Sequence, residues 1–234
     1  MANTRPRDDL VTAVHEALAA HADAEHGLGQ QRYMKSHLPY LGLTTPVLRK
    51  ALRPVLADPA YRIGDREEGE ATVRALWDGA THREYWYAAL ALLGHRAYRP
   101  WRDPDTLELM ADLIRAGAWW DVVDDIATHR VREVLLGWPD EVGPVLREWA
   151  HDGHLWIRRA AIIAQVGAKQ ATDTALLTEV IEPNIDDLDF FIRKAIGWVL
   201  RDYARTDPDW VLAFVEAHPD LSGLSRREAL KHLR

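Results

Sequence analysis

The 234-residue sequence contains no cysteine, and this absence excludes several kinds of site. Without thiols there is no disulfide, no zinc–thiolate or iron–sulfur site and no cysteine nucleophile. The GxxxxGK[ST] phosphate loop, the GxGxxG dinucleotide fingerprint and the GxSxG nucleophile elbow are also missing. The pairs His21/His26 and His151/His154 lack a third ligand at a recognised spacing. We therefore expect neither a metal nor a cofactor.

Long apolar runs are absent too. No segment approaches the roughly 18 apolar residues of a membrane span, and the first ten residues, MANTRPRDDL, are polar and carry no apolar signal segment. We expect a cytoplasmic, bacterial protein with no membrane partner. The 47% hydrophobic content is sufficient for a sizeable core. We treat residues 1–234 as a single domain and expect a monomer.

Phenylalanine and lysine are scarce, whereas tryptophan and arginine are abundant. There are 3 Phe against 10 Trp, and 5 Lys against 24 Arg. Guanidinium groups suit phosphate recognition because they pair bidentately with its oxygens. The net charge of −7 argues against broad attraction to nucleic acid but allows a local basic face. Residues 1–155 hold 18 basic and 24 acidic residues, and 156–234 hold 11 and 12, so we expect that face in the C-terminal third.

The apolar residues recur at helical spacing along the whole chain, and no long alternating, β-branched segment competes with them. Thr45 before Pro46 is a helix-start signature. Short breakers such as Asp152-Gly153 separate the periodic segments. The pattern predicts about a dozen short helices, which include residues 10–20, 67–77, 83–93, 105–116, 119–136, 140–150, 155–166, 173–181, 188–203, 208–217 and 225–233.

The chain also repeats itself. The segment WIRRAAI at Trp156 recurs as FIRKAIG at Phe191, an offset of 35 residues, and YAAL at Tyr87 matches RAAI at Arg159, 72 residues on. Helix pairs that recur every 35–47 residues or so are typical of α-solenoids of the HEAT or armadillo type. We therefore predict an all-α fold, an α-solenoid of HEAT-like repeats. Equivalent positions of successive repeats would line one concave face.

Four residues could carry chemistry on that face. Trp120 and Asp124 are four residues apart and share one side of a helix. Arg159 lies in the first echo segment, and Trp198 lies one turn after Lys194 of the second. From spacing alone two interpretations stay open. Both tryptophans could be core residues with Asp124 paired to Arg159, or the four could form a functional cleft.

Longer segments resemble one family, the AlkD-like DNA alkylation repair glycosylases, which are built of HEAT-like repeats. The resemblance runs from about residue 30 to the C-terminus and is loose over 58–80. Its most specific part is the long block at 191–206 together with its spacing to the Trp-Trp-Asp segment. The matching segments are YMK at 33–35, LGL at 41–43, AWWDVVD at 118–124, LWIRRAAI at 155–162, FIRKAIGWVLRDYART at 191–206 and LSRREALKH at 224–232.

The resemblance implies a function and its residues. Carried over by motif, Trp120, Asp124 and Trp198 are expected to be catalytic and Arg159 to bind a DNA phosphate. The family is known for excising cationic N3- and N7-alkylpurines from double-stranded DNA without flipping the base, unlike most glycosylases. With no lysine in the group to form a Schiff base, we expect a monofunctional enzyme that leaves an abasic site. Further candidate DNA contacts are Tyr33, Lys35, Arg158, Lys194, Arg201, Arg227 and Lys231.

Two alternatives remain open. A relative adapted to bulky N3-alkyladenine adducts could be a self-resistance enzyme against a DNA-alkylating natural product. A HEAT-like scaffold could also bind DNA or protein without catalysis. Asp124 argues against the second alternative, because a carboxylate facing phosphates would cost a pure DNA-binding protein affinity.

Overall fold

The computed structural model describes residues 5–233, and every regular element in that range is helical, as predicted. None of these helices is both long and apolar enough to cross a membrane. Contacts divide the chain into two compact units, one ending at Trp101 and the other beginning at Arg102. The single domain over residues 1–234 stays a prediction.

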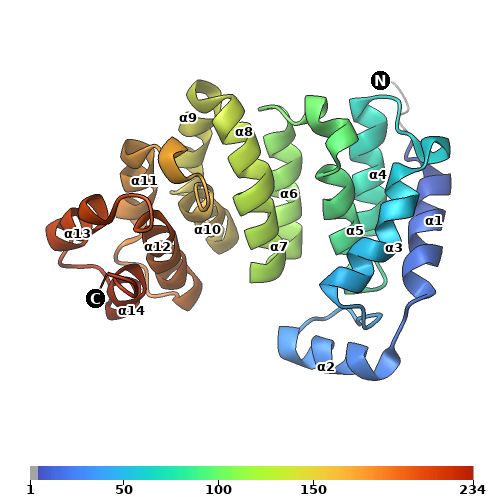
Figure 1. The fold of residues 1–234 in the computed structure, drawn as a ribbon, viewed down its shortest axis with the longest axis horizontal. Coiled ribbons are helices and arrows are strands. Elements are labelled where there is room, and N and C mark those ends of the chain that lie inside the picture. The colour runs from blue at the N-terminus through green and yellow to red at the C-terminus, as the bar shows by residue number, and fades with distance from the viewer. Residues whose placement is uncertain (1–4, 234) are drawn as a thin grey trace. The chain divides into compact units, whose positions relative to one another are not determined.

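The N-terminal unit is a cluster of five α-helices and two 3₁₀ turns. Helix α1 packs against α3, α4 and α5, and α4 lies along α5 (Figure 1). Helix α2 is absent from the predicted set because it has no continuous apolar stripe: only Gly27 and Met34 are buried. The elements are α1 (Asp8–Ala19), α2 (Ala24–Met34), α3 (Thr45–Ala57), η1 (Pro59–Tyr61), α4 (Arg66–Asp78), α5 (Arg83–Leu93) and η2 (Arg96–Trp101).

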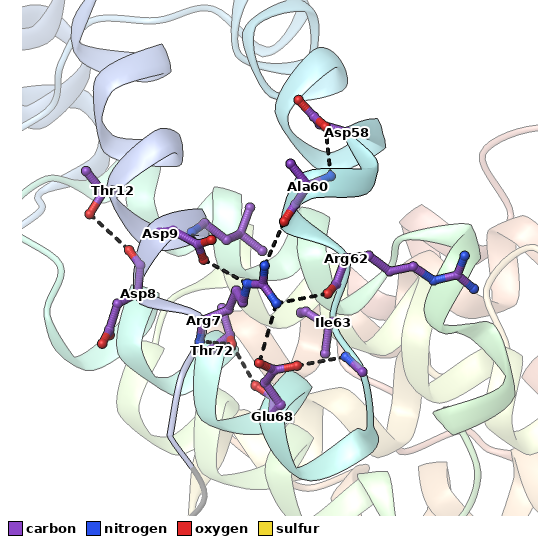
Figure 2. A network of polar contacts seen from close by, with 12 residues as sticks. Arg7, Asp8, Asp9, Thr12, Asp58, Ala60, Arg62, Ile63, Glu68 and Thr72 are labelled. Atoms are coloured by element: carbon purple, nitrogen blue, oxygen red, sulfur yellow. Dashed lines mark hydrogen bonds and ion pairs between the residues drawn. The ribbon is translucent and has the colours of Figure 1, made fainter.

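Arg7 fastens the start of α1 to the rest of this unit (Figure 2). Its guanidinium donates to the carbonyl oxygen of Ala60, at 2.6 Å, and to the side chain of Asp9, at 2.8 Å. Its backbone N–H donates to the hydroxyl of Thr72, at 2.9 Å. One residue therefore joins α1, η1 and α4 through hydrogen bonds that satisfy polar groups at the helix end.

A buried carboxylate folds the connection between α2 and α3. Glu84 is fully buried and accepts hydrogen bonds from the backbone N–H groups of Leu41, Gly42 and Leu43. Gly42 has φ +97°, and a Cβ there would collide with the carbonyl oxygen of Asp23. The glycine therefore allows the connection to lie directly against the start of α2.

The C-terminal unit is a series of helices, most of which pack on their neighbours along the chain. Helix α10 lies at its centre and contacts α6, α7, α9, α11 and α12, and α12 packs closely on α14 (Figure 1). The elements are α6 (Thr106–Gly117), α7 (Trp120–Asp125), the π-helix η3 (Ile126–Val131), α8 (Arg132–Gly137), α9 (Pro139–Trp149), α10 (Leu155–Ile163), η4 (Lys169–Ala171), α11 (Thr174–Ile181), η5 (Glu182–Asn184), α12 (Phe190–Tyr203), α13 (Pro208–Ala217) and α14 (Gly223–Ala229).

Polar contacts in this unit join residues about one predicted repeat apart. Partners are 32 positions apart for Arg147 and Glu179, 34 for Asn184 and Ala150, and 36 for His218 and Glu182. A separation this regular means that each layer of helices bonds to the layer one repeat before it. The contacts agree with the 35-residue echo of the sequence and with the solenoid arrangement.

The segment predicted as one helix over 119–136 contains a π-helical stretch. Helix α7 ends at Asp125, the π-helix runs from Ile126 to Val131, and α8 continues from Arg132. At the junction, the hydroxyl of Thr128 donates to the carbonyl oxygen of Asp124, at 2.7 Å. Such stretches are rare and often occur at functional sites.

Candidate active site

Three neighbouring helices of the C-terminal unit, α7, α10 and α12, carry the residues singled out for chemistry. Helix α7 begins after a sharp turn, because Ala118 adopts a left-handed conformation with φ +35°. Helix α12 begins at a side-chain cap, in which Asp189 accepts a hydrogen bond from the N–H of Phe191, at 2.6 Å. Since α10 contacts both α7 and α12, residues on its face can reach either helix.

Asp124 and Arg159 form a bidentate ion pair at the centre of this group. Nε of Arg159 lies 2.8 Å from Oδ1 of Asp124, and one terminal nitrogen lies 2.9 Å from Oδ2. The other terminal nitrogen donates to the carbonyl oxygen of Phe191, at 2.6 Å. Arg159 is only 4% exposed, whereas Asp124 keeps 18% of its side-chain surface. The guanidinium therefore holds the carboxylate at the edge of solvent and links all three helices.

The environment of Asp124 acts on its charge in two directions. Burial raises the pKa of this carboxyl above its ordinary value, and the nearby charge of Asp121 adds to the rise. The hydrogen bonds and charge of Arg159 oppose burial without cancelling it. Asp124 therefore resembles a catalytic carboxylate in being poorly solvated, and one fixed partner offsets part of the cost of its charge.

Aromatic rings surround the guanidinium. The centroids of the Phe191 and Trp198 rings lie 5.9 and 6.0 Å from Cζ of Arg159. Phe191 also packs 4.8 Å from Trp156 and 5.5 Å from Trp119, measured between ring centroids. This cluster excludes water from one side of the ion pair and strengthens its electrostatics.

Trp120 and Trp198 are both half-buried, so neither is a simple core residue. Trp120 is the first residue of α7, one turn before Asp124, and its indole makes no hydrogen bond or ring contact with the part of the chain that the structure describes. Of the first interpretation left open by spacing, the pairing of Asp124 with Arg159 is confirmed and the burial of both tryptophans in the core is not. The functional cleft stays a prediction.

Arg159 does not stand free for a phosphate. Three of its N–H groups are engaged by Asp124 and Phe191, and its side chain is buried. The structure gives this residue a partner different from the predicted one. Its contact with DNA stays a prediction, and the geometry favours a role in positioning Asp124.

Arg158 is likewise engaged with protein groups. It lies 2.8 Å from a carboxylate oxygen of Asp187 and donates to the carbonyl oxygen of Asp152. Burial alone would raise the pKa of Asp187, but the N–H of Asp189 and the Arg158 charge outweigh it, so that pKa lies below its ordinary value. The positive charge of Arg158 is therefore largely compensated.

Glu228 on α14 neutralises two further candidates. Lys194 lies 2.9 Å from one of its oxygens, and Arg201 contacts the other. The hydrogen bond from Lys194, opposed by burial and supported by the charges of Arg201 and Lys231, lowers the pKa of Glu228. The close approach of α14 depends on Gly197, where a Cβ would lie 2.5 Å from Cβ of Glu228.

The remaining candidates are exposed. The side chains of Arg227 and Lys231 form no hydrogen bond or ion pair with residues 5–233. In the N-terminal unit, Tyr33 is 77% exposed and Lys35 is an exposed residue with φ +51° at the end of α2. Arg158, Lys194 and Arg201 do not form the basic face expected in the C-terminal third, because each of them is paired with a carboxylate.

Sequence reasoning missed three groups at this site. Phe191 contributes both its carbonyl oxygen and its ring, while Asp187 and Glu228 contribute compensating charges. Phe191 had a signal, since it follows Trp156 by the echo distance of 35 residues. The two carboxylates had none, because ion-pair partners depend on which helices pack together. Within the described range, no cluster of three or more His, Asp or Glu could hold a metal ion.

The whole-chain comparison decides the family. The profile of the DNA alkylation repair enzyme family matches residues 14–233. The chain belongs to the DNA alkylation repair enzyme family. A search of curated proteins returned no match.

Two solved structures place this family member among helical repair proteins. A predicted DNA alkylation repair enzyme from Enterococcus faecalis shares 27% of its residues, with a TM-score of 0.80 over 91% of this chain and 96% of the other. The alkylpurine DNA glycosylase AlkC of Pseudomonas fluorescens, bound to DNA containing an abasic site analog, shares 19%, with a TM-score of 0.57. That match covers 97% of this chain and 62% of AlkC, and at this identity it shows a common fold.

Proposed function

We propose that this family member is an AlkD-like, monofunctional DNA glycosylase. It hydrolyses the N-glycosidic bond of cationic N3- or N7-alkylated purines in duplex DNA without base flipping and leaves an abasic site. The observation that carries the proposal is the half-buried Asp124 carboxylate, which Arg159 holds bidentately, with accessible Trp120 one turn before it and Trp198 beside the guanidinium. Family membership and the fold shared with a glycosylase support it.

The chemistry of the substrate explains why so few groups are needed. Alkylation at N3 or N7 gives the purine a positive charge, so it departs as a neutral base without protonation by a general acid. The C1′–N bond breaks with its electron pair going to the purine, and positive charge develops on the sugar. A carboxylate near C1′ stabilises that charge, a contribution worth roughly a hundredfold or more in rate.

Asp124 can supply both this charge and a base. A carboxylate has about four lone-pair sites, and Arg159 uses one on each oxygen. The remaining sites can accept a hydrogen bond from water. As the water oxygen bonds to C1′, Asp124 takes its proton. The faces of Trp120 and Trp198 would attract the electron-poor sugar, and this attraction grows as charge develops.

The group near Asp124 offers no free amine for a lyase step. Lys194, on α12, is ion-paired with Glu228. A lyase step needs an amine that can reach C1′, whereas the Nζ of Lys194 is held 2.9 Å from a carboxylate oxygen of Glu228. This supports the proposal that the enzyme releases the base and leaves the strand intact. We further propose that the stacked helices are HEAT-like repeats, and that the protein acts as a monomer in the bacterial cytoplasm.

The deciding experiment measures release of free base from duplex DNA that contains 7-methylguanine or 3-methyladenine. Asp124→Asn removes the charge but retains an oxygen that can accept from Arg159, and we expect excision to fall about a hundredfold or more with DNA binding within about threefold. The matched control is Asp125→Asn, the next residue on α7, whose partners are His129 and Arg130. It should excise like the wild type.

Each other outcome redirects the assignment. Equal excision by Asp124→Asn and wild type would remove Asp124 from the mechanism. If the wild type releases neither methylpurine, the same assay with a bulky N3-alkyladenine adduct tests the self-resistance alternative. Binding of damaged duplex with no release from any substrate would make the protein a non-catalytic scaffold.

A further inference from the structure

One segment of the N-terminal unit carries a concentration of positive charge that the functional residues above do not include. Residues 26–57 contain five basic residues and no acidic one, in a chain with a net charge of −7. The segment spans most of α2, the connection at 35–44 and all of α3. Its basic residues are Arg32, Lys35, Arg49, Lys50 and Arg53.

The structure gathers three of these residues on the outer face of α3. Leu48, Ala51 and Leu52 form the buried face of this helix. Arg49, Lys50 and Arg53 occupy the opposite face, because positions i, i+1 and i+4 lie within about half a helical turn of one another. Together with Pro46 they line an open hollow of about 500 Å³.

In the described part of the chain, no carboxylate compensates this cluster. All three side chains are exposed, and none forms a hydrogen bond or ion pair with any residue between 5 and 233. Glu84, which organises the connection that precedes α3, is fully buried and occupied by three backbone N–H groups. Three neighbouring cations with no partner repel one another, which costs stability unless an anion binds there.

We propose that the α3 cluster, defined as Arg49, Lys50 and Arg53, is a contact surface for the phosphate backbone of duplex DNA. The inference rests on the proposed action on duplex DNA and adds a binding surface to it. A strand of phosphates supplies anions at a spacing of several ångströms, which suits cations at successive positions of one helix face. Two arginines can bind phosphate oxygens bidentately, and Lys50 adds a point charge.

Salt dependence is the signature of such a surface. Each phosphate contact releases condensed counterions and contributes about 0.9 to the slope of log affinity against log salt. The variant R49Q/K50Q/R53Q should therefore have a slope smaller by roughly two to three. At about 0.1 M salt its affinity for an undamaged duplex should be roughly ten- to a hundredfold weaker. Glutamine is a good helix former, so α3 should persist.

The matched control removes the same amount of charge from scattered positions. Arg62, Arg96 and Lys169 are also exposed and without an ion pair in the described part of the chain, but they share no helix face. The variant R62Q/R96Q/K169Q should keep the wild-type slope. R49K/R53K, which preserves the charge, should retain most of the affinity. Circular dichroism and thermal unfolding of every variant check the fold.

Excision assays separate this inference from the proposed function. With enzyme below saturation, excision by R49Q/K50Q/R53Q should fall in step with its loss of affinity, whereas Asp124→Asn should bind without excising. If the wild type binds duplex with the expected slopes but releases no base, the surface stands and the catalytic proposal fails. The inference would be overturned if R49Q/K50Q/R53Q bound duplex DNA with wild-type affinity and salt slope. Equal losses of affinity in the two triple variants would also overturn it, and so would a wild type that binds no duplex DNA.

Discussion

The basic residues of α12 and those of α3 are alike in type but differ in what surrounds them. Lys194 and Arg201 share one carboxylate, Glu228, whereas Arg49, Lys50 and Arg53 have none among residues 5–233. Long-range attraction depends on net local charge, so a compensated cation contributes little to it. The difference teaches that a count of arginines and lysines along the sequence does not locate an anion-binding surface. The position of such a surface depends on which arginines and lysines have a carboxylate packed beside them.

The strongest test of this comparison is Arg159→Ala. It leaves the half-buried Asp124 without its partner, so we expect unfolding to become easier by about 3 kcal/mol and excision to fall at least about a hundredfold. The salt slope of DNA binding should stay near that of the wild type, in contrast to the α3 variant. Urea unfolding, single-turnover excision and salt titration measure the three effects.

The control for this variant is Arg158→Ala, an adjacent residue paired with the more exposed carboxylate of Asp187. Arg158→Ala should lower the free energy of unfolding by less than Arg159→Ala does, and it should leave the excision rate nearly unchanged. If Arg159→Ala reduced the salt slope of DNA binding by about 0.9 and retained excision, Arg159 would be a phosphate contact as predicted from the sequence. It would then no longer differ from the α3 cations in this respect.

A smaller effect is expected from Gly197→Ala, which acts on the compensated region itself. The new Cβ would lie 2.5 Å from Cβ of Glu228 and 3.1 Å from the carbonyl oxygen of Ser225. Overpacking of this kind costs about 1–3 kcal/mol, which thermal unfolding would detect. Gly29→Ala is the control, because a Cβ there meets nothing within 4 Å and should stabilise its helix by about 0.5–1 kcal/mol. Similar behaviour of the two variants would mean that α14 adjusts easily.

The dependence on pH should distinguish Asp124 from the compensating carboxylates. Excision requires ionised Asp124, and its raised pKa means that protonation begins at a higher pH than for an exposed aspartate. The pKa values of Asp187 and Glu228 are lowered, so the stability they contribute is present above their unfolded-state pKa and is lost only as pH falls through the lower folded values. Excision should therefore fall on acidification before the fold is lost.

Single-turnover rates, corrected for spontaneous base loss, and circular dichroism over one pH series measure this order. Coincident loss of excision and helicity would show that Asp124 titrates with the fold rather than before it.

The smallest expected effect is a gain from Glu228→Gln. Removing this charge frees Lys194 and Arg201, so affinity for duplex DNA should rise about severalfold and the salt slope should increase by up to about two. Salt titration measures both quantities. The control is Glu179→Gln, which frees the exposed Arg147 on α9. No gain from Glu228→Gln would mean that the α12 cations do not face the bound DNA.

The sequence predicted the helical class well because the periodicity of apolar residues is strong in helices such as α10 and α12. It missed α2, whose exposed Leu28 and Tyr33 break the apolar stripe, and it missed the π-helix, since one additional residue per turn barely disturbs a local pattern. Trp120, Asp124, Arg159 and Trp198 were named from motifs. The pairing of Asp124 with Arg159 was foreseen as one of two interpretations. The neutralisation by Glu228 depends on the packing of α14 and has no local signal.

The π-helical stretch after Asp124 sets the rotational phase between two otherwise ordinary helices. Adding or removing one residue turns everything downstream by about 100° around the helix axis. Helix α7 presents Asp124 to α10, while Arg132 at the start of α8 donates to the carbonyl oxygen of Val166 beyond the other end of α10. Both hydrogen bonds require the present rotation of α8 relative to α7 about the helix axis. The stretch works as a fixed angular spacer, so insertions and deletions in 126–131 should be far rarer among homologous proteins than in the neighbouring loops.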